Sequence, residues 1–572
     1  MAAALPVDPE TSKPIVYPVV IVGPGKAHND KTTLSQNGKI ELELDSEERH
    51  LFDGIIKACK AWEDGVVEGF SPLKLQVRVA GGWVRDKVLG LNTHDVDIAL
   101  DACTGVEFAR CMKQFMEQHE DQKLGKIGVI AANPAQSKHL ETATMKVFGI
   151  EVDFCNLRAE SYAEDSRIPT TMVGTPLEDS YRRDLTMNAL YYNLHTNKIE
   201  DWTRRGLKDL LETKVATTPL EAYQTFHDDP LRVLRAIRFA VRYDMQLSEE
   251  LQTASMNMQI HEELHRKVSR ERVGKELEGM LSGKHANPIE ALKLICRLKL
   301  AGSVFCIPAD EVLLGNISKL HLDMTPYQQD KKEDRDYLIG VAWEEALECI
   351  QALPPVLQCV QSNSSNARIS FDPRLTYLAV TILPFGKLMY VEKKKSKTVI
   401  EFMIREGIKF KNKDVINVIS IFNQVDAMKD LMHRVPESNP STRLEAGLIL
   451  REAKDMWVTV LVLATVSLLR QKPNECDWCA RAQQWRETIV TELSLEECWK
   501  VKPLLNGKEI IELLGLPKGP IVGTYAQEQT KWILMNPTGT LEECKEFLTT
   551  YKKKRDYEQN QAAEPVAKKV HL

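Results

Sequence analysis

The sequence lacks an apolar run long enough to cross a membrane. Its longest mostly apolar segment, Trp457 to Leu469, is shorter than the roughly 20 residues that a membrane-spanning helix needs. We therefore expect a buried core helix there and no membrane partner. Residues 1–14 have no basic stretch ahead of an apolar one, so we expect neither a secretory signal nor a transit peptide.

Cysteine and net charge are also scarce. The 572 residues include 12 cysteines, scattered apart from Cys476 and Cys479, which indicates a reduced intracellular protein rather than a disulfide scaffold. Lysine and arginine number 75 against 81 acidic residues, a net charge of −6. This balance does not exclude a nucleic-acid partner, because phosphates bind local basic patches rather than a net charge.

The length predicts several domains, about four at roughly 150 residues each. Short β-type runs mix with helical ones early in the chain, and strand signals nearly stop after about residue 206. The tail is polar from Lys552 and is expected to fray. We predict a loose N-terminal extension (1–45), an α/β head (46–205), and a helical neck (206–285), body (286–470) and tail (471–572).

Within the head, five segments read as strands and two as helices. The predicted strands are Leu75–Ala80, Val96–Leu100, Ile127–Ala132, Thr144–Leu157 and Leu190–Leu194. The predicted helices are Trp83–Leu89 and Gly105–Gln118.

A glycine turn stands between the first strand and the first helix of this head. Gly81 and Gly82 let the backbone approach a ligand closely. The helix that begins there offers unpaired N–H groups and a positive dipole end to a phosphate. Arg85, one turn further on, is placed to reach the same anion.

Carboxylates follow the turn. Asp95 and Asp97 share one face of a strand, and aligned carboxylates of this kind suit Mg²⁺ together with substrate phosphates. A solvated strand edge is the alternative, but the nearby glycine turn favours the metal site. A third carboxylate is expected on a neighbouring strand, where Glu151 and Asp153 share a face; either could serve, and we prefer Asp153.

These motifs resemble those of the CCA-adding enzymes, class II tRNA nucleotidyltransferases of the polymerase β superfamily. The resemblance covers about residues 71–282 strongly and continues in a plant- or fungus-like pattern to about residue 550. It implies an α/β nucleotidyltransferase head followed by all-α neck, body and tail domains. It also implies two Mg²⁺ ions on catalytic Asp95, Asp97 and Asp153, CTP and ATP as substrates, and the tRNA acceptor stem and 3′ end as partner.

Five family motifs are matched, and the resemblance carries their roles to this chain. The nucleotide-binding set is Gly81, Gly82, Arg85, Arg182, Arg183, Asp184, Asn188, Asp229, Arg232 and Arg235. The structural or hinge set is Asp201, Gly206, Asp209, Ser269 and Arg272. Asp228 stands where the family usually has glutamate, which leaves its role open. Residues 159–179 match the family's flexible loop at full length, which is associated with addition of the final A.

The chemistry of the motif at residues 228–232 explains how a protein selects C and A without a template. Both bases present an exocyclic amine beside a ring-nitrogen acceptor. The Asp229 carboxylate accepts from the amine and the Arg232 guanidinium donates to the ring nitrogen. Uracil and guanine would leave buried groups unpaired, at about 1–3 kcal/mol each. Alternatively, Asp229 is only the N-cap of a helix with Pro230 at its first position, and the two roles are compatible.

A basic segment lies in the predicted body. Residues 387–413 hold eight lysines and one arginine against three glutamates. Lys393, Lys394 and Lys395 are the densest part and are predicted to contact the tRNA backbone; a solvated surface is the alternative. Lys552–Arg555 is a weaker candidate for RNA contact or a nuclear signal.

Two other motifs point to different chemistry. His261 and His265 form an HExxH string, but no third ligand follows at a useful spacing, so a metalloprotease is rejected. Cys476 and Cys479 form an isolated CxxC pair, whereas a structural zinc site needs about four ligands.

The sequence therefore predicts template-independent, sequential addition of C, C and A to tRNA 3′ ends, with release of pyrophosphate. A poly(A) polymerase of the same superfamily and a non-catalytic tRNA-binding protein are the alternatives. No protein partner is implied. Because family members can serve several compartments, we expect a cytoplasmic protein with possible nuclear and mitochondrial pools.

Overall fold

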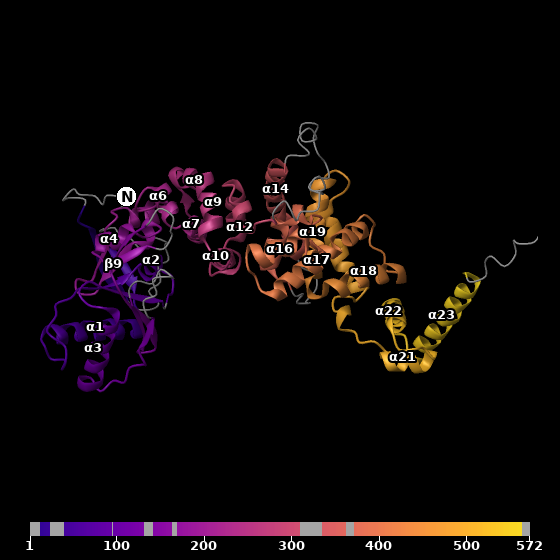
Figure 1. The fold of residues 1–572 in the computed structure, drawn as a ribbon, viewed down its shortest axis with the longest axis horizontal. Coiled ribbons are helices and arrows are strands. Elements are labelled where there is room, and N and C mark those ends of the chain that lie inside the picture. The colour runs from indigo at the N-terminus through magenta and orange to yellow at the C-terminus, as the bar shows by residue number, and fades with distance from the viewer. Residues whose placement is uncertain are drawn as a thin grey trace, which may run out of the picture. The chain divides into compact units, whose positions relative to one another are not determined.

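The structure is a computed structural model that describes residues 12–22, 39–93, 95–130, 141–162, 169–308, 335–361 and 371–562. The chain divides into two compact units, residues 1–305 and 306–572 (Figure 1). Over the described ranges, no helix is long and apolar enough to span a bilayer.

A nine-stranded mixed sheet forms the centre of the first unit. Its strand order is β2-β1-β11-β10-β3-β4-β7-β6-β5. Only the β1–β2 and β4–β7 pairs of this sheet are parallel. The strands are β1 (Ile15–Val22), β2 (Ile40–Glu43), β3 (Val77–Ala80), β4 (Val96–Leu100), β5 (Gly128–Ile130), β6 (Thr142–Val147), β7 (Ile150–Asn156), β10 (Leu190–Asn193) and β11 (Lys198–Asp201).

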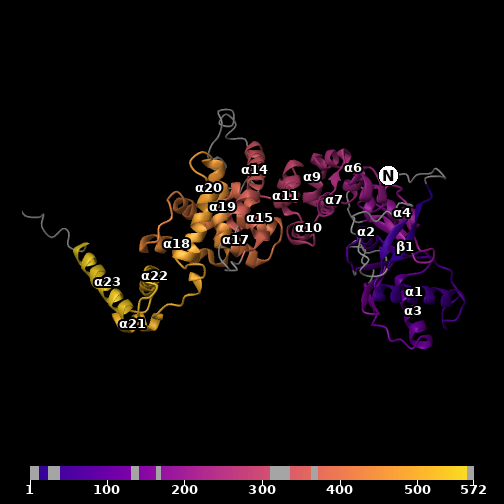
Figure 2. The same ribbon diagram turned by 180° about the vertical axis from the view of Figure 1, so that it is seen from behind.

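Helices α1 (Ser46–Glu63) and α3 (Gly105–His119) pack together, and both contact β7 (Figures 1 and 2). Each begins at a capping box, Asp45 with Glu48 and Thr104 with Glu107, which satisfies the free N–H groups of its first turn. Two shorter helices lie at or next to the motifs described above: α2 (Gly82–Val88) and α4 (Pro176–Tyr181).

A helical segment completes the first unit. Helix α7 (Leu231–Arg242) packs on α10 and α11 and buries Val233, Leu234, Ile237 and Ala240 along one side. The unit ends at Phe305, so it includes α11 and α12 beyond the predicted neck boundary at 285. The other elements are α5 (Gly206–Lys208), η3 (Asp209–Thr213), α6 (Ala222–Asp228), α8 (Glu249–Ser255), α9 (Met258–Lys267), α10 (Arg270–Ser282), α11 (Pro288–Arg297) and α12 (Ala301–Phe305).

The described residues of the second unit are helical apart from one hairpin. Helix α19 is buried along almost its whole length and packs on α14, α15 and α17, which confirms the predicted core helix. Helices α21, α22 and α23 enclose a separate small core that includes Ile510, Tyr525 and Leu548. The main helices are α14 (Arg335–Gln361), α15 (Pro373–Thr381), α16 (Val399–Phe402), α17 (Asn412–Met432), α18 (Pro440–Ala453), α19 (Trp457–Gln471), α20 (Trp478–Glu487), α21 (Gly507–Leu514), α22 (Pro520–Met535) and α23 (Leu541–Ala562).

The structure corrects three expectations. Residues 15–22 and 40–43 are strands of the head sheet rather than a loose extension. The predicted strand Thr144–Leu157 is two antiparallel strands, because Phe148 and Gly149 turn the chain with positive φ angles of 48° and 95°. Helix α23 continues through Ala562 instead of fraying from Lys552, which pairs with Asp556 one turn on at 2.8 Å.

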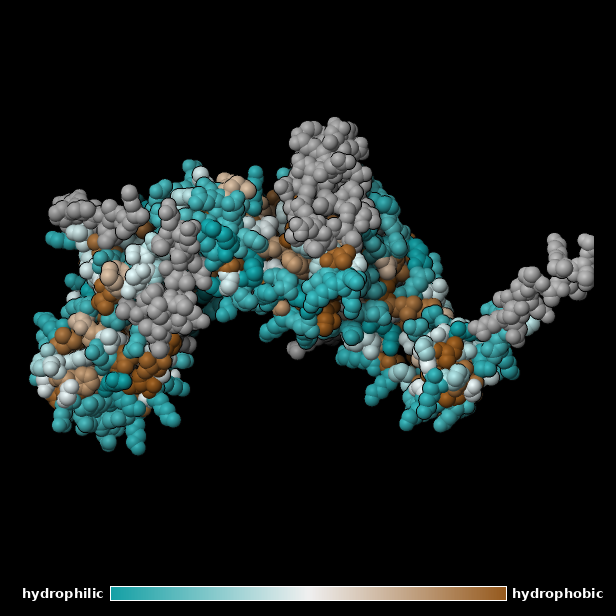
Figure 3. All heavy atoms as spheres, in the orientation of Figure 1, coloured by the Kyte–Doolittle hydropathy of each residue, from teal (hydrophilic) through white to brown (hydrophobic). Residues whose placement is uncertain are grey.

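Strands also occur outside the main sheet. Three small two-stranded sheets pair β8 (Arg158–Ser161) with β9 (Thr170–Val173), β12 (Val215–Ala216) with β13 (Gln246–Leu247), and β14 (Met389–Glu392) with β15 (Lys395–Thr398). The predicted flexible loop therefore begins as a hairpin, with residues 163–168 outside the described part of the chain, and ends in α4. On the face seen in Figure 3, hydrophilic residues cover most of the surface of the described residues.

Candidate active site

Two of the predicted metal ligands lie side by side on the only parallel strand pair in the middle of the sheet. Asp97 on β4 is the register partner of Asp153 on β7. The Thr144 hydroxyl on β6 donates a 2.5 Å hydrogen bond to Asp153 Oδ1 and fixes that carboxylate. Asp95 is exposed just before β4, and Glu151 is exposed opposite Lys146 on β6. The register thus favours Asp153 over Glu151 as the third carboxylate.

The three carboxylates influence one another electrostatically. Burial, with repulsion by Asp95 and Asp153, raises the pKa of Asp97 to about 6, although Arg183 and Arg158 oppose the rise. Hard oxygen ligands with mutual repulsion suit a divalent cation such as Mg²⁺. However, no three His, Cys, Asp or Glu side chains of the described residues are gathered closely enough to form a ready metal cage.

The glycine turn is enforced by its neighbours. Gly81 has φ +61°, and a Cβ atom there would lie 2.6 Å from Nη1 of Arg183 and 3.1 Å from the carbonyl oxygen of Asn188. Helix α2 begins at the next residue, Gly82. Both the conformation and the space therefore require glycine at position 81.

Arg85 faces the protein interior. Its side chain is buried and donates to Asp86 Oδ1 at 2.8 Å and to Asn188 Oδ1 at 2.5 Å. It lies over the rings of Phe239 on α7 and of Tyr243, the residue that follows α7. These contacts make it a link between α2, Asn188 and α7. Its predicted role as a phosphate ligand stays a prediction.

Arg182 and Arg183 share one buried acid that sequence reasoning missed. Asp179 on α4 accepts hydrogen bonds from both guanidinium groups and from the Tyr191 hydroxyl. Burial alone would raise the pKa of Asp179, but these partners outweigh it and hold the pKa well below its usual range. The signal was available, because positions i, i+3 and i+4 share one helix face. The arrangement sets Arg183 beside the glycine turn.

Asp184 and Asn188 are joined in the same region. Asp184 Oδ1 accepts from the Asn188 carboxamide at 2.9 Å, and its Oδ2 accepts from Arg235 Nε at 2.7 Å. Burial opposes ionisation of Asp184, but Arg235 and Asn188 hold its pKa below the usual range. Asp184 is therefore an ionised acceptor at neutral pH, and it connects the segment 182–188 to α7.

The predicted base-reading pair lies where α6 meets α7. Asp229 Oδ1 accepts from the Leu231 N–H at 3.2 Å, and Oδ2 accepts from Arg272 at 2.9 Å. Pro230 is the N-cap of α7, not its first helical residue as predicted, although the Asp229 side chain still caps the helix. Arg232 is buried and donates to the carbonyl of Arg182 and to the Tyr162 hydroxyl.

The predicted hinge residues form hydrogen bonds around the start of α5. Asp201 accepts from the Thr203 hydroxyl and the Leu207 N–H. Asp209 accepts from two threonine hydroxyls, those of Thr186 and Thr217. A Cβ atom added at Gly206 would lie 2.6 Å from the backbone oxygen of Thr186. Ser269 is the N-cap of α10, and Arg272 donates to Asp229 as described.

The lysine cluster belongs to a hairpin. Lys393 and Lys394 make the turn between β14 and β15 with φ angles of 47° and 66°, and Lys395 begins β15; all three are exposed. The zinc-type histidine string does not form a site, since His261 is buried with Nε2 2.7 Å from the Ser255 carbonyl.

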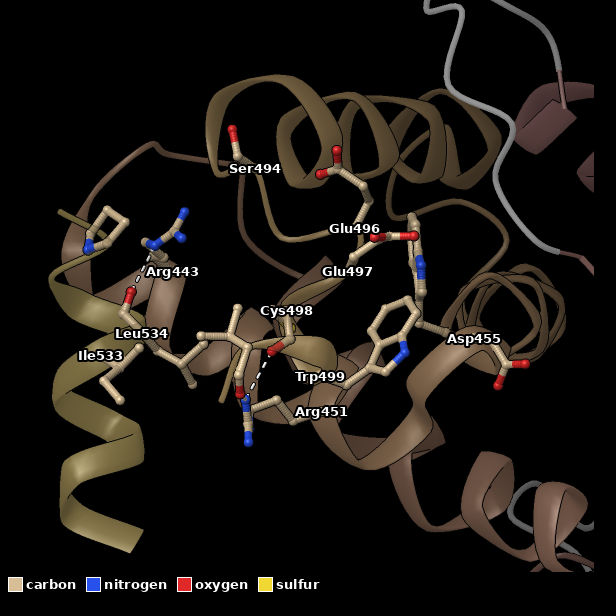
Figure 4. A pocket seen from close by; sticks show the side chains of 13 residues that line it. Arg443, Arg451, Asp455, Ser494, Glu496, Glu497, Cys498, Trp499, Ile533 and Leu534 are labelled. Atoms are coloured by element: carbon tan, nitrogen blue, oxygen red, sulfur yellow. Dashed lines mark hydrogen bonds between the residues drawn. The ribbon is translucent and has the colours of Figure 1, made fainter. Parts of the chain in front are cut away.

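Two pockets are lined by residues of the second unit. One has a volume of about 460 Å³ and is lined by residues of α18, α22 and the segment after α20 (Figure 4). Its arginines, Arg443 and Arg451, donate to the backbone carbonyls of Leu534 and Cys498. The carboxylates, the glycine turn and the α7 arginines all belong to the first unit.

The fold and these side chains define a nucleotidyltransferase. A family model described as the poly A polymerase head domain matches residues 77–216. The solved CCA-adding enzyme of Bacillus stearothermophilus in complex with CTP has a TM-score of 0.55 at 19% identity, covering 90% of this chain and 100% of that one. A Thermotoga maritima CCA-adding enzyme complexed with tRNA has a TM-score of 0.52 at 20% identity, over 89% and 96%.

Sequence relatives narrow the class. The chain is 35% identical over 513 residues to a mitochondrial CCA tRNA nucleotidyltransferase of Candida glabrata, covering 86% of this chain and 93% of that protein. It is 34% identical over 495 residues to the Saccharomyces cerevisiae protein of the same name, covering 82% and 87%. The chain belongs to the CCA tRNA nucleotidyltransferase family.

Proposed function

We propose that this enzyme adds C, C and A in turn to the 3′ end of tRNA, without a nucleic-acid template. It takes CTP and ATP as substrates and releases pyrophosphate. The observation that carries the proposal is the meeting of three groups in one unit: the Asp97–Asp153 register pair, the glycine turn against Arg183, and the Asp229–Arg232 pair of the α6–α7 junction. The membership of the family supports it.

The triphosphate is held by the turn and by the arginines beside it. Arg182 and Arg183 are fixed on Asp179, and the start of α2 contributes backbone N–H groups. Asp184 and Asn188, joined by their hydrogen bond, are the proposed ribose contacts, since an ionised carboxylate accepts from a sugar hydroxyl. Catalysis then depends on positioning and fixed charges.

The base is selected by Asp229 and Arg232. The Arg272 guanidinium fixes one oxygen of Asp229, and the other accepts from the exocyclic amine of C or A. Arg232 Nη2 donates to the Tyr162 hydroxyl and to a backbone carbonyl, so its donors must be shared with, or released to, the base. Asp228 accepts from Gln224 at 2.7 Å and is not needed for base reading.

Asp95, Asp97 and Asp153 would hold two Mg²⁺ ions. Their fit rests on the donor set and on the raised pKa of Asp97, which comes from burial and from its neighbouring carboxylates. When bound, Mg²⁺ supplies charge neutralisation for the phosphates and acidifies the attacking 3′ hydroxyl. The Thr144 hydroxyl keeps Asp153 oriented for this role.

The tRNA and the compartment are proposed with the same assignment. Helical elements of both units, with the exposed Lys393–Lys395 hairpin, contact the acceptor stem and the RNA backbone. The two yeast relatives carry mitochondrial names, and we place pools of this protein in mitochondria, cytoplasm and nucleus.

Incorporation by the purified protein tests the proposal. The substrates are tRNA transcripts that end at the discriminator base, at C and at CC. In the presence of Mg²⁺, each is offered the four nucleoside triphosphates one at a time and as a mixture. Ordered addition of C, C and A that then stops is expected. Long A tails on any RNA would instead identify a poly(A) polymerase, and tRNA binding without incorporation a non-catalytic binding protein.

A further inference from the structure

Three ion pairs meet on the ring of Phe239. The guanidinium carbons of Arg85, Arg235 and Arg238 lie 4.9, 5.3 and 4.2 Å from its centroid. Phe239 itself is 7% exposed. Distances below about 6 Å are those of cation–π contacts, which strengthen when the partners are desolvated. Phe239 is therefore the common neighbour of three buried or partly buried cations.

Each cation is paired with a carboxylate, and Glu276 also lies 3.7 Å from Arg235 Nη1. Arg85 pairs with Asp86 at 2.8 Å, Arg235 with Asp184 at 2.7 Å, and Arg238 with Glu276 at 2.6 Å. The carboxylates come from α2, from the segment between α4 and β10, and from α10. An aromatic ring among three like charges offers each guanidinium a favourable negative face without competing for its carboxylate. The ring thus lies among three paired cations, two of which, Arg235 and Arg238, share Glu276.

Two of these arginines end a chain of contacts that runs through the proposed ribose site. Arg85 donates to Asn188 Oδ1, Asn188 donates to Asp184 Oδ1, and Arg235 donates to Asp184 Oδ2. Because Arg85 and Arg235 both rest on Phe239, the chain closes into a ring. The orientation of Asp184 and Asn188 is then set from both sides.

We propose that Phe239 is the positioning residue that fixes the nucleotide-binding pair Asp184 and Asn188 through Arg85 and Arg235. The inference rests on the proposed function, because it takes Asp184 and Asn188 as nucleotide ligands. Phe239 acts through the arginines and does not itself contact the substrate. Neighbouring Tyr243 supports the arrangement, with its ring 4.6 Å from Arg85 and its hydroxyl donating to Asp86 at 2.7 Å.

Graded fluorination of the ring at position 239 separates electrostatics from packing. Replacement by 4-fluoro-, 3,5-difluoro- and 3,4,5-trifluorophenylalanine weakens the negative ring face stepwise while preserving the shape closely. The same series at Phe226 is the matched control, because it is fully buried on α6 and has no arginine or lysine over its ring among the described residues. Binding of CTP, of ATP, and of tRNA in the absence of added CTP or ATP is measured on the full-length protein.

The expected result is a stepwise loss of CTP and ATP affinity at position 239, reaching about tenfold for the trifluoro ring. Affinity for tRNA and the nucleotide affinities of the Phe226 series remain constant. Equal effects at the two positions, or no loss at position 239 while the unmodified protein binds both nucleotides, would overturn the inference alone. Absence of CTP and ATP binding by the unmodified protein would overturn both the inference and the proposed function.

Discussion

Asp97 on β4 and Asp153 on β7 face each other in register across a parallel strand pair. Fifty-five residues of sequence, including a helix and a hairpin, separate them, and the sheet alone brings their carboxylates together. Side chains of register partners project from the same face of a sheet. This relationship anchors the assignment of the catalytic carboxylates.

The first prediction concerns these acids. Asp97→Asn and Asp153→Asn are each expected to lower the rate of nucleotide incorporation by about 100-fold or more, as the loss of a fixed electrostatic group does. Glu151→Gln is the control, since Glu151 is exposed opposite Lys146, and it should keep most activity. Labelled CTP incorporation into tRNA measures all three. An inactive Glu151→Gln beside an active Asp153→Asn would reverse the assignment.

The second prediction concerns the glycine turn. Gly81→Ala combines a φ of +61° with a Cβ only 2.6 Å from the Arg183 guanidinium, so Arg183 must move and activity should fall sharply. Gly90→Ala is the control, because its φ is +68° but nothing lies within 4 Å of the added carbon. Strain at positive φ alone costs about 1–3 kcal/mol. Melting temperatures should therefore fall for both variants, but nucleotide affinity only for Gly81→Ala.

The third prediction is a pH dependence of stability. The folded pKa of Asp179 lies below its unfolded value of about 3.9, since two arginines and Tyr191 overcome the cost of burial. Its contribution is therefore present above pH 4 and lost as the pH falls below that value. Asp179→Asn should cost about 3 kcal/mol at pH 7, and the difference from the wild type should shrink below pH 4.

Urea unfolding at pH 7, 5 and 3 measures that difference. Glu178→Gln is the neighbouring control, because a glutamine can replace the glutamate of the Thr175 capping box. A destabilisation by Asp179→Asn that stays the same from pH 7 to pH 3 would contradict the electrostatic explanation.

The fourth prediction concerns base selection. Asp229→Asn places an amide donor where the carboxylate accepts, so the ratio of UTP to CTP incorporation should rise about tenfold or more. Asp228→Asn is matched in chemistry and adjacent in sequence, but its carboxylate bonds to Gln224. It should leave the ratio unchanged. Competition between UTP and CTP on a tRNA lacking CCA measures both, and equal ratios in the two variants would refute the base-reading role.

The fifth prediction concerns the lysine hairpin. Lys393→Asn with Lys394→Gly removes two charges while keeping residues that favour a turn with two positive φ angles. If these lysines contact phosphates, tRNA affinity should fall, and the slope of log affinity against log salt should decrease by about one per contact. Lys545→Gln, on α23 where Lys545 pairs with Glu542, is the control. Identical salt slopes in all three proteins would remove the hairpin from the RNA interface.

The motifs could be predicted from the sequence because the residues of each lie close together in the chain. A glycine pair between a strand and a helix, an Asp-x-Asp strand and a helix that starts at Pro230 each depend on neighbours within a few residues, so β3, α2, β4 and the start of α7 were predicted close to their observed positions. The split of residues 144–157 into two strands was missed, because a strand reversal over Phe148 and Gly149 has only a weak local signal. The strand β1 was missed because its partner is distant: β1 pairs with β11 some 180 residues on. The strand β2 was missed with it, because β2 pairs with β1.

What the sequence alone determined is which residue types stand at which spacing, and from these it predicts the chemistry: carboxylates for metal ions, a phosphate-binding turn, and an acid–base pair complementary to C and A. Tertiary structure decided which groups act together. It placed Asp97 beside Asp153 rather than Glu151, gave Arg182 and Arg183 the shared acid Asp179, and turned Arg85 inward onto Phe239. These choices depend on strand register and on buried pairing between distant segments, which are set by the packing of the whole unit and not by any short stretch of chain.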